Sequence, residues 1–449
     1  MALPPGPALH PVLQVVRWVR NPFRVMDECH AQFGDTFTLR LPPFGKMVVV
    51  SNPDDVKEVF ALGSDEGHAG KANFVLKPFL GKHSVLLLDG AEHLRQRKMM
   101  LPSFHGERMQ AYGQSMTELA HDSIDAWPIG KSFAVHRPMQ QITLQVIVRT
   151  VFGIAEGPRF AELSDVLTRA LDAGAWPGLL FPFLQRDLGP LSPWGKFVRL
   201  QRRASEILRS EIRRGRETGT AGRTDVLAML LDARDDGGRP LTEDEVHDEL
   251  TTLLLAGHET TATSLAWALR WILPDRGLIE HLREELATAD GDPVRVAKLE
   301  LLDATVREAL RLQPIIPVVG RVLQRPMKIG SRDFKEGTLV APAVYLVHQR
   351  PSLYPDPRAF RPERFLKFKP SPSEWLPFGG GLRRCIGAAF ALYEMKMVLA
   401  SMLPRVDARL ADDRVAISRR GVTLTPTGGL RIVVTARRPR PDVTRAKAA

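Results

Sequence analysis

A glycine-rich loop near the C-terminal end of the chain holds the most reactive candidate residue. Cys385 stands in Phe378-Gly379-Gly380-Gly381-Leu382-Arg383-Arg384-Cys385-Ile386-Gly387. Three consecutive glycines let the backbone turn tightly and approach a flat object closely. The apolar spacing of residues 388–403 predicts a helix directly after the cysteine, and a helix N-terminus beside two arginines favours thiolate over thiol. The pattern indicates a nucleophile or a metal ligand, although no base for a nucleophile is evident nearby. The alternative is a core cysteine in a turn.

A second candidate site lies in the middle of a long predicted helix. Thr242 and Glu245 form a capping box that begins the helix, and Pro274 ends it. Its middle reads Ala256-Gly257-His258-Glu259-Thr260-Thr261. Glycine and threonine weaken a helix interior, because glycine is flexible and threonine can bond back to a carbonyl. We expect a local widening that makes room for a ligand; the alternative is an imperfection in a core helix.

Two pairs of charged residues have helical spacing. Glu308 and Arg311 are three residues apart in an amphipathic helix ended by Pro314, so they share a face. His93 and Arg97 are four residues apart on an earlier helix. Taken alone, the first pair is typical of a surface salt bridge that stabilises little, and the second of a solvated basic helix.

Missing motifs exclude several common chemistries. The chain has no G-x-x-x-x-G-K-[ST] phosphate loop, no G-x-G-x-x-G and no G-x-S-x-G. His258-Glu259 begins H-E-x-x-H, but Ala262 replaces the second zinc ligand. With only Cys29 and Cys385, a disulfide scaffold and a four-cysteine zinc site are excluded. Cys29 is predicted to be a core residue.

Together, the motifs resemble those of the cytochrome P450 family. Its cysteine-loop pattern F-x-x-G-x-R-x-C-x-G is matched here by Phe378, Gly381, Arg383, Cys385 and Gly387. The similarity covers about residues 34–434 and includes the helix motif at residues 256–261 and Pro-Glu-Arg-Phe at residues 362–365. It implies haem b (iron protoporphyrin IX) with Cys385 as the thiolate ligand of the iron, which favours O–O cleavage.

The resemblance also implies roles for residues outside the loop. It assigns the haem propionates, held by charge-assisted hydrogen bonds, to Arg383, His93, Arg97 and Arg321. Phe378 and Gly387 would contact the haem, and Ala256 and Gly257 would lie over its face. Thr260 would bond the bound dioxygen while Glu259 relays protons. Glu308, Arg311 and Arg364 would form a buried structural network.

The family's variable segments predict an apolar substrate pocket. Its expected lining is Phe74, Leu76, Phe79, Leu86, Leu179, Phe181, Leu253, Ala256, Ile316 and Val318. The implied reaction is hydroxylation or epoxidation by O2 of a fatty acid, terpenoid, steroid or other bulky apolar molecule. Electrons would come from a ferredoxin or flavodoxin with its reductase. That acidic partner is expected to dock on a basic face made of Arg383, Arg384, Lys396, Arg95 and Lys98.

Three alternatives differ in what they require. A peroxide-driven peroxygenase or hydroperoxide isomerase of the same fold commonly lacks the acid–alcohol pair, which Glu259 and Thr260 supply here. A non-catalytic haem-binding protein would usually carry a signalling domain, and none is evident. A nucleic-acid binder is supported only by net charge, 62 − 51 = +11, without a groove-reading motif.

Composition and texture describe the scaffold. The chain has 449 residues, 44% apolar and 25% charged, which is typical of a folded globular protein. We expect a mainly α protein with smaller β regions (α+β). The family resemblance implies a triangular helical prism with haem between the long central helix and the cysteine-loop helix. The β-rich parts are expected at about 35–60, 318–348 and 415–436, the last a hairpin turning at 427–429. The helical parts are expected at about 91–313 and 388–403.

The domain prediction is an N-terminal segment with the first helix (1–33), a single catalytic domain (34–436) and a basic, disordered tail (437–449). Without a signal peptide or a run of about 18 apolar residues, we expect a cytoplasmic monomer without stable membrane insertion.

Overall fold

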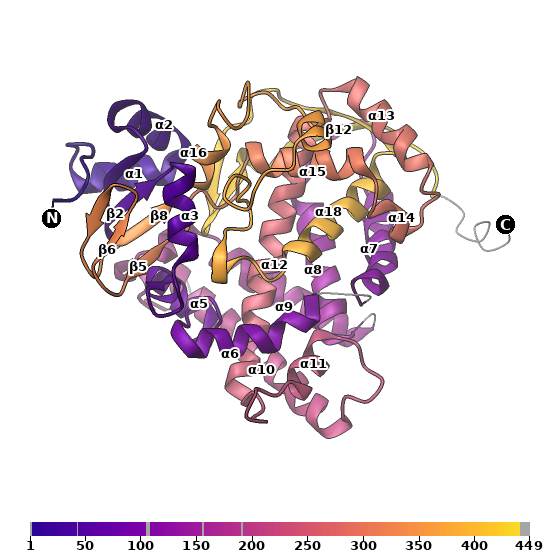
Figure 1. The fold of residues 1–449 in the computed structure, drawn as a ribbon. Helices are drawn as coiled ribbons and strands as arrows, with labels where there is room; N and C mark the ends of the chain where they lie inside the picture. Colours follow the sequence, from indigo (N-terminus) through magenta and orange to yellow (C-terminus); the bar gives the residue numbers. More distant parts are fainter. Residues whose placement is uncertain (1, 43, 105–107, 155–156, 190–191, 441–449) are drawn as a thin grey trace.

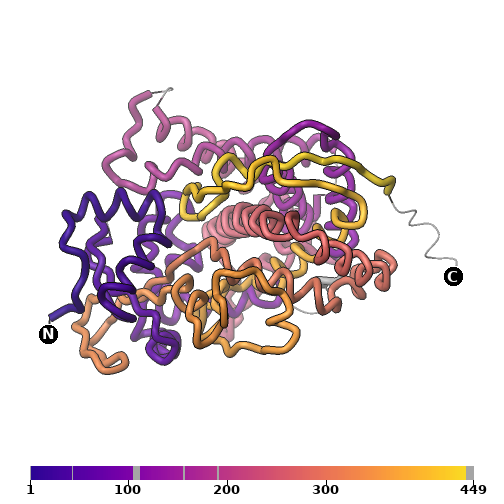
Figure 2. The backbone as a smooth tube through the Cα atoms, turned by 90° about the horizontal axis from the view of Figure 1, so that it is seen from above, coloured from indigo at the N-terminus to yellow at the C-terminus, as the bar shows by residue number. Residues whose placement is uncertain are grey.

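The computed structural model describes residues 2–42, 44–104, 108–154, 157–189 and 192–440. Helices make up most of it, and its outline is roughly triangular (Figure 1). The long helix α12 (Glu243–Ile272) runs through the middle of the molecule (Figure 2). Thr242 and Glu245 form the predicted capping box at its start. The chain thus folds as the predicted mainly α protein with smaller sheets.

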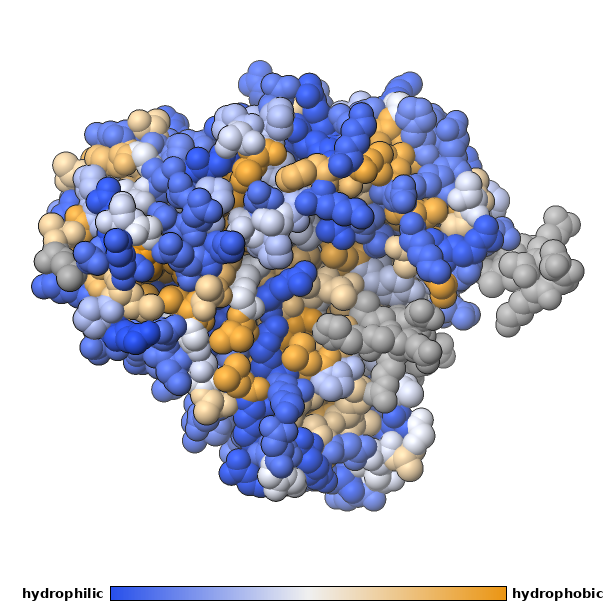
Figure 3. Space-filling view, viewed as in Figure 1, coloured by the Kyte–Doolittle hydropathy of each residue, from blue (hydrophilic) through white to orange (hydrophobic). Residues whose placement is uncertain are grey.

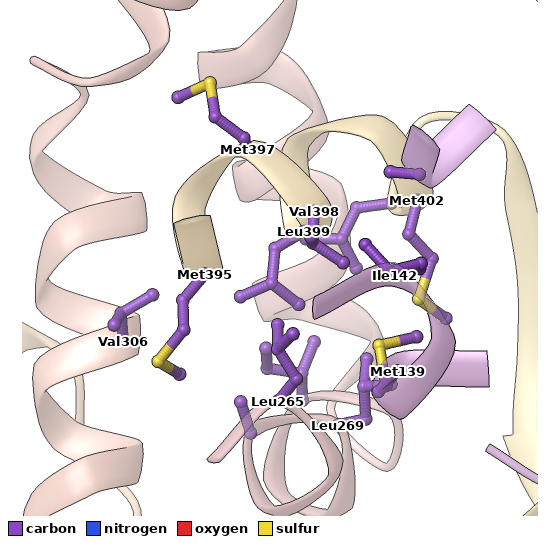
Figure 4. Packing of buried hydrophobic residues seen from close by; sticks show 14 of the residues in the cluster. Met139, Ile142, Leu265, Leu269, Val306, Met395, Met397, Val398, Leu399 and Met402 are labelled. Atoms are coloured by element: carbon purple, nitrogen blue, oxygen red, sulfur yellow. The ribbon is translucent and has the colours of Figure 1, made fainter. Parts of the chain in front are cut away.

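The main core surrounds the C-terminal half of α12. Helices α7 (Arg108–Asp125), α8 (His136–Phe152), α15 (Glu300–Leu312) and α18 (Ala388–Met402) pack around it. Figure 4 shows Leu265 and Leu269 of α12 between Met139 and Ile142 of α8 and Leu399 of α18. These side chains are almost fully buried, so α18, which follows the cysteine loop, is fixed against α12 by apolar packing.

A second core lies around the N-terminal half of α12. It consists of α8, α9 (Pro158–Gly174), α10 (Pro193–Thr218) and α11 (Val226–Asp232). α10 and α11 of this group lie at the lower corner in Figure 1. The remaining helices and turns are α4 (Ala69–Ala72), η1 (Phe74–Leu76), α5 (Lys77–Leu80), η2 (Leu101–Phe104), η3 (Pro177–Leu180), η4 (Pro182–Leu184), α13 (Arg276–Ala287) and α14 (Pro293–Val296).

The main sheet lies at the opposite corner, next to α1 (Pro11–Arg20) and α2 (Pro22–Phe33) (Figure 1). Its strand order is β1-β2-β8-β5-β3, with β1 (Thr36–Leu41), β2 (Gly45–Val50), β8 (Leu339–Pro342), β5 (Arg321–Leu323) and β3 (Gly67–His68). β1 and β2 form an antiparallel hairpin within the first predicted β-rich part, and β2 pairs with β8 in parallel. A separate hairpin joins β6 (Met327–Ile329) to β7 (Arg332–Phe334).

The ends of two predicted β-rich regions are helical instead. Asn52 caps α3 (Pro53–Ala61), with its side chain accepting from the Asp54 N–H and proline at the first position. Beyond β8 the chain forms α16 (Val344–His348), whose residues are all buried. Within the region predicted as helical, β4 (Ser132–Ala134) is a short strand.

The predicted C-terminal hairpin has a different turn. β10 (Ile417–Arg420) pairs with β11 (Thr423–Pro426), and the chain turns at Gly421, whose φ is +56°. Residues 427–429 form η6 (Thr427–Gly429), which leads to β12 (Arg431–Arg437) in another sheet, between β4 and β9 (Val406–Leu410). The prediction of the hairpin turn at 427–429 was wrong. Glycine at residue 421 and at residues 428–429 permits a turn at either place, and the pairing of β12 with β9 and β4, which decides between them, is a long-range contact.

The predicted basic tail is described only in part. Arg438 pairs with Asp407 at 3.0 Å, and Arg440 pairs with Asp122 at 3.0 Å. Residues 441–449 lie outside the described residues.

Candidate functional site

The cysteine loop has the tight backbone that its glycines predict. Gly379 and Gly381 have φ of +64° and +63°, a conformation that side chains with a Cβ rarely adopt. A Cβ on Gly381 would lie 2.0 Å from the Phe60 carbonyl oxygen. The Cys385 N–H donates to the Phe378 carbonyl at 2.9 Å and closes the loop. The cysteine is thereby held directly before α18, after η5 (Gly381–Arg383).

The Cys385 side chain combines accessible surface with close protein surroundings. It is accessible to solvent, yet the surrounding protein raises the pKa of the thiol by burial, while a Gly387 N–H and the charges of Arg97 and Arg384 act in the opposite direction. Ala256 is likewise exposed, although it lies in the middle of the central helix. Leu253 and Ile386 pack into the same two cores, which brings this part of α12 next to the cysteine loop. Cys385 and Ala256 are therefore both accessible, although each lies within packed parts of the fold.

Three arginines and a histidine meet beside the loop. His93 and Arg97 come from α6 (Gly90–Met100), Arg321 from β5 and Arg383 from the loop. Burial first, and then the positive charges of Arg383, Arg97 and Arg321, lower the pKa of His93 to about 3. Burial also lowers the pKa values of Arg321 and Arg383 to about 10. The structure thus gathers the four residues that the resemblance assigns to the propionates.

The carboxylates near these cations are few, which fits a ligand with negative charges. Arg383 pairs with Asp89, which also accepts from the backbone N–H groups of residues 70–71. Asp89 was not predicted as a site residue, because no motif in the sequence includes it. Arg97 and Arg321 have no carboxylate partner among the described residues, and Arg321 donates to two backbone carbonyls. Buried unpaired cations are costly, so the propionates of a haem suit this cluster.

Glu259 of α12 is held by side chains of α8 and β10. It accepts hydrogen bonds from Gln140 at 2.8 Å and from Arg420 at 3.0 Å, and it lies 3.4 Å from His136 Nε2. Burial raises its pKa, but the hydrogen bond and charge of His136 and the charge of Arg420 together lower it to about 2. Arg420 also pairs with Asp172 on α9. Glu259 is therefore ionised and tied to two other elements.

A surface hollow of about 380 Å³ lies at the outer end of this network. Its lining includes His136, Asp172, Ala175, Trp176, Ser418, Arg419, Arg420 and Thr425. Polar groups thus lead from the surface to Glu259, next to Thr260 in the sequence. Neither His136 nor Arg420 was predicted, because each comes from an element far away in the chain.

The helix motif departs from its prediction in two respects. α12 is continuous through residues 256–261, so the expected widening is not observed. The Thr260 hydroxyl donates back to the Ala256 carbonyl, as threonine can. A Cβ on Gly257 would lie 2.6 Å from Ile147 Cδ1 of α8. The glycine therefore permits close packing of α8 on α12 rather than leaving room for a ligand.

A buried ion-pair network holds the segment before the cysteine loop. Arg311 donates through Nε and Nη2 to both carboxylate oxygens of Glu308, at 2.6 and 2.8 Å, and both side chains are fully buried. Arg364, on α17 (Glu363–Lys367), lies 3.2 Å from Glu308. Arg311 also donates to the carbonyls of His348 and Pro357, each at 2.8 Å. The network joins α15 to the chain that leads to Cys385.

His348, for which the sequence indicated no role, extends this network. Its Nδ1 lies 3.0 Å from the Arg311 carbonyl, and its Nε2 accepts from the Leu376 N–H at 2.8 Å. One neutral tautomer satisfies both bonds. Burial, followed by the charge of Arg311, lowers the pKa of His348 to about 3.

The predicted pocket residues occupy several places. Leu76, Phe79, Leu86 and Leu179 pack in one cluster with Leu255 of α12. Phe79 and Leu179 are buried there. The other predicted residues lie elsewhere. Val318 packs by the main sheet, Phe74 packs against Phe44, and Phe181 packs against Phe183. Leu253 packs against the two helical cores, and Ile316 is half-buried. Phe74 and Phe44 also line a surface hollow of about 500 Å³.

Comparison with known proteins decides the family. The family model described as "Cytochrome P450" matches residues 4–431. The chain belongs to the cytochrome P450 family. This P450 is 40% identical to the putative cytochrome P450 135B1 of Mycobacterium bovis over 98% of this chain and 92% of that one. It is 33% identical to the putative cytochrome P450 138 of Mycobacterium tuberculosis over 96% of each chain.

A solved structure shows the same fold. The retinoic acid-bound cyanobacterial CYP120A1 matches with a TM-score of 0.83 at 25% identity, covering 97% of this chain and 100% of that one. The P450 is accordingly an oxidoreductase of the haem-dependent monooxygenase family. Within the described residues, the helices are too short or too polar to cross a membrane. Polar residues cover most of the face in Figure 3, with apolar residues gathered near its middle.

Proposed function

We propose that this P450 inserts one oxygen atom from O2 into an apolar organic substrate, by hydroxylation or epoxidation. The observation that carries the proposal is Cys385, held in a glycine loop beside three arginines and His93 and accessible to solvent, as is Ala256 of the central helix. A haem b ligated by Cys385 would supply the activation of O2. Residues 34–436 would form one catalytic domain of a cytoplasmic monomer.

The remaining site residues bind, orient or move protons. Arg97, Arg321 and His93 would hold the propionates, with Arg383 shared between a propionate and Asp89. Glu259 would accept protons that enter through the hollow at His136 and pass them toward Thr260. A low pKa keeps Glu259 ionised between transfers.

The substrate class follows from the apolar surroundings. Leu76 and Leu86 cluster with Leu255 of α12, and Val318 packs next to the main sheet. Such lining suits a fatty acid, terpenoid or steroid. The structural neighbour is bound to retinoic acid, an apolar carboxylic acid, which supports a substrate of similar character.

A reduced-plus-CO difference spectrum tests the thiolate. The purified chain should give the thiolate-type Soret maximum, and Cys385→Ser should abolish it. Cys29→Ser is the matched control, since Cys29 is buried in a separate cluster and should leave the spectrum unchanged. A histidine-type spectrum in the folded wild-type protein would overturn the proposal.

We further propose an acidic ferredoxin or flavodoxin, with its reductase, as the electron donor. The predicted docking face needs correction, because Lys396 is buried and pairs with Asp303 at 2.9 Å. Arg95 pairs with Asp235 and Glu245, each at 2.8 Å. Arg384 is exposed beside Cys385, and Lys98 is exposed as well.

Charge reversal at Lys98 tests this docking face. Lys98→Glu should slow the first reduction by an acidic donor at low salt and leave the CO spectrum intact, since long-range steering depends on charge. Lys369→Glu, an exposed reversal outside the predicted face, is the control. Equal reduction rates for wild type and Lys98→Glu at low salt would contradict this docking face.

A further inference from the structure

One partly buried arginine carries two buried hydrogen-bond donors without a partner among the described residues. Arg419 lies on β10, and its Nε and Nη2 atoms are buried without a hydrogen-bond partner among the described residues. Its Nη1 reaches the Val422 carbonyl only at 3.5 Å. Burial is the cause that lowers the pKa of Arg419 to about 10. A desolvated cation without a counter-charge is costly, so a ligand that supplies one would be bound strongly.

The free edge of Arg419 has the shape that a carboxylate requires. Nε–H and Nη2–H point the same way and match two carboxylate oxygens. Two other arginines of this chain use the same edge. Arg311 binds Glu308 with it at 2.6 and 2.8 Å, and Arg223 binds Asp225 at 2.8 and 2.8 Å. Arg419 differs from them in having no carboxylate from the described chain.

The strand register places Arg419 beside the predicted substrate segments. Arg419 is paired with Leu424, so both side chains lie on one face of the hairpin. Leu424 packs in the cluster that contains Val318, and its N–H donates to the Ile315 carbonyl at 3.0 Å. On the opposite face, Arg420 binds Glu259. Arg419 also lines the surface hollow that His136 and Arg420 border, so the hairpin adjoins both the proton network and the apolar cluster of Leu424.

The hairpin is also anchored to the segment that follows α9. The Gly421 N–H at the turn donates to the Ala175 carbonyl at 2.6 Å. Ala175 lies shortly before Leu179 and Phe181, which were predicted to line the substrate pocket. Two stretches with predicted pocket residues therefore adjoin the hairpin that carries Arg419.

We propose that Arg419 binds the carboxylate end of an apolar carboxylic acid substrate. The inference rests on the proposed function, because it specifies the substrate of the same site. One guanidinium edge balances one negative charge, whereas a phosphate monoester would need additional donors. Leu424, the cross-strand partner of Arg419, belongs to an apolar cluster that suits the hydrocarbon part of such an acid.

Binding measurements with matched ligands test the proposal on the full-length protein. Tetradecanoic acid and retinoic acid are each compared with their methyl esters by isothermal titration calorimetry. At least one acid should bind the wild type about tenfold or more tightly than its ester, as a charge-assisted pair implies. Arg419→Leu should lose this preference with ester affinity unchanged. Arg419→Lys should retain part of it, because lysine lacks the planar fork.

The control is Arg414→Leu, which changes an exposed arginine just before β10 and should keep the wild-type preference. Arg419→Leu should unfold at the same or higher urea concentration than wild type, since it removes an unpaired buried charge. No acid preference in the wild type, or an unchanged preference in Arg419→Leu, would overturn the assignment. The CO spectrum of the same samples separates the two proposals: acid preference without a thiolate spectrum would retain Arg419 and reject the monooxygenase.

Discussion

Replacement of Glu308 by glutamine should destabilise the protein more than any surface charge change. The carboxylate accepts from Arg311 at two positions, from the Arg361 N–H at 2.9 Å and from Arg364 at 3.2 Å. Glutamine keeps the shape but removes the negative charge and turns an NH2 group toward these donors. Arg311 would then remain a fully buried cation, bonded to backbone carbonyls without a counter-ion.

The magnitude follows from burial. Removing one partner of a buried ion pair costs about 3–5 kcal/mol, because the other charge stays desolvated. Glu28 offers a matched control: it pairs with Arg24 at 2.9 Å, but both side chains are exposed. Glu28→Gln should therefore cost less than about 1 kcal/mol.

Urea unfolding at pH 7, followed by circular dichroism, measures both variants against the wild type. The expected result is a large fall in the unfolding midpoint for Glu308→Gln and a small one for Glu28→Gln. This network holds the segment before Cys385 in place, so Glu308→Gln should also lower the haem content of the expressed protein. If the two variants lose similar free energy, the buried pair does not stabilise the fold in the way argued.

Three more predictions address the loop, the pH dependence and the proton path. Gly379→Ala should lower the free energy of unfolding by about 1–2 kcal/mol, because alanine rarely adopts the left-handed backbone at this position. Gly381→Ala should lower it more, because its Cβ would also collide with the Phe60 carbonyl. Equal losses of thermal stability in the two variants would contradict the collision. His348 has a folded pKa of about 3, below its ordinary 6.5, so its contribution to stability is full above pH 6.5 and falls as the pH drops toward 3. Urea unfolding at pH 6.5, 5.5 and 4.5 gives the slope of the unfolding free energy against pH. This slope should be about 1.4 kcal/mol per pH unit smaller in His348→Gln than in the wild type, and equal slopes would refute the role of His348. Glu259→Gln should slow turnover about 100-fold and raise the peroxide released per electron consumed, whereas unchanged coupling would exclude Glu259 from proton delivery.

The motifs within single segments could be predicted from sequence because their geometry is local. The capping box at Thr242 and the glycine turn before Cys385 depend only on neighbouring residues, and both form as expected. The spacing of Glu308 and Arg311 fixed that they share a helix face, but surface pairs have the same spacing. Only the packing of α15 shows that this pair is fully buried.

Residues without a motif could not be found in this way. Asp89, His136 and Arg420 each act through contacts with residues more than 100 positions away. Long-range pairing also decided the C-terminal strands, where β12 joins β9 and β4 instead of continuing the hairpin. Gly257 shows the same limit, since its role depends on Ile147 of α8.

The sequence by itself determined the family, because the motif of the cysteine loop lies within one short segment. The protonation of Cys385 depends on the fold, since burial raises the pKa of its thiol. The tertiary structure decided which charges are buried and which are paired. It removed Lys396 from the surface, joined Glu259 to Arg420, and left the guanidinium edge of Arg419 without a partner in the described chain. Burial and pairing depend on what packs against a side chain, and that information is spread over the whole fold.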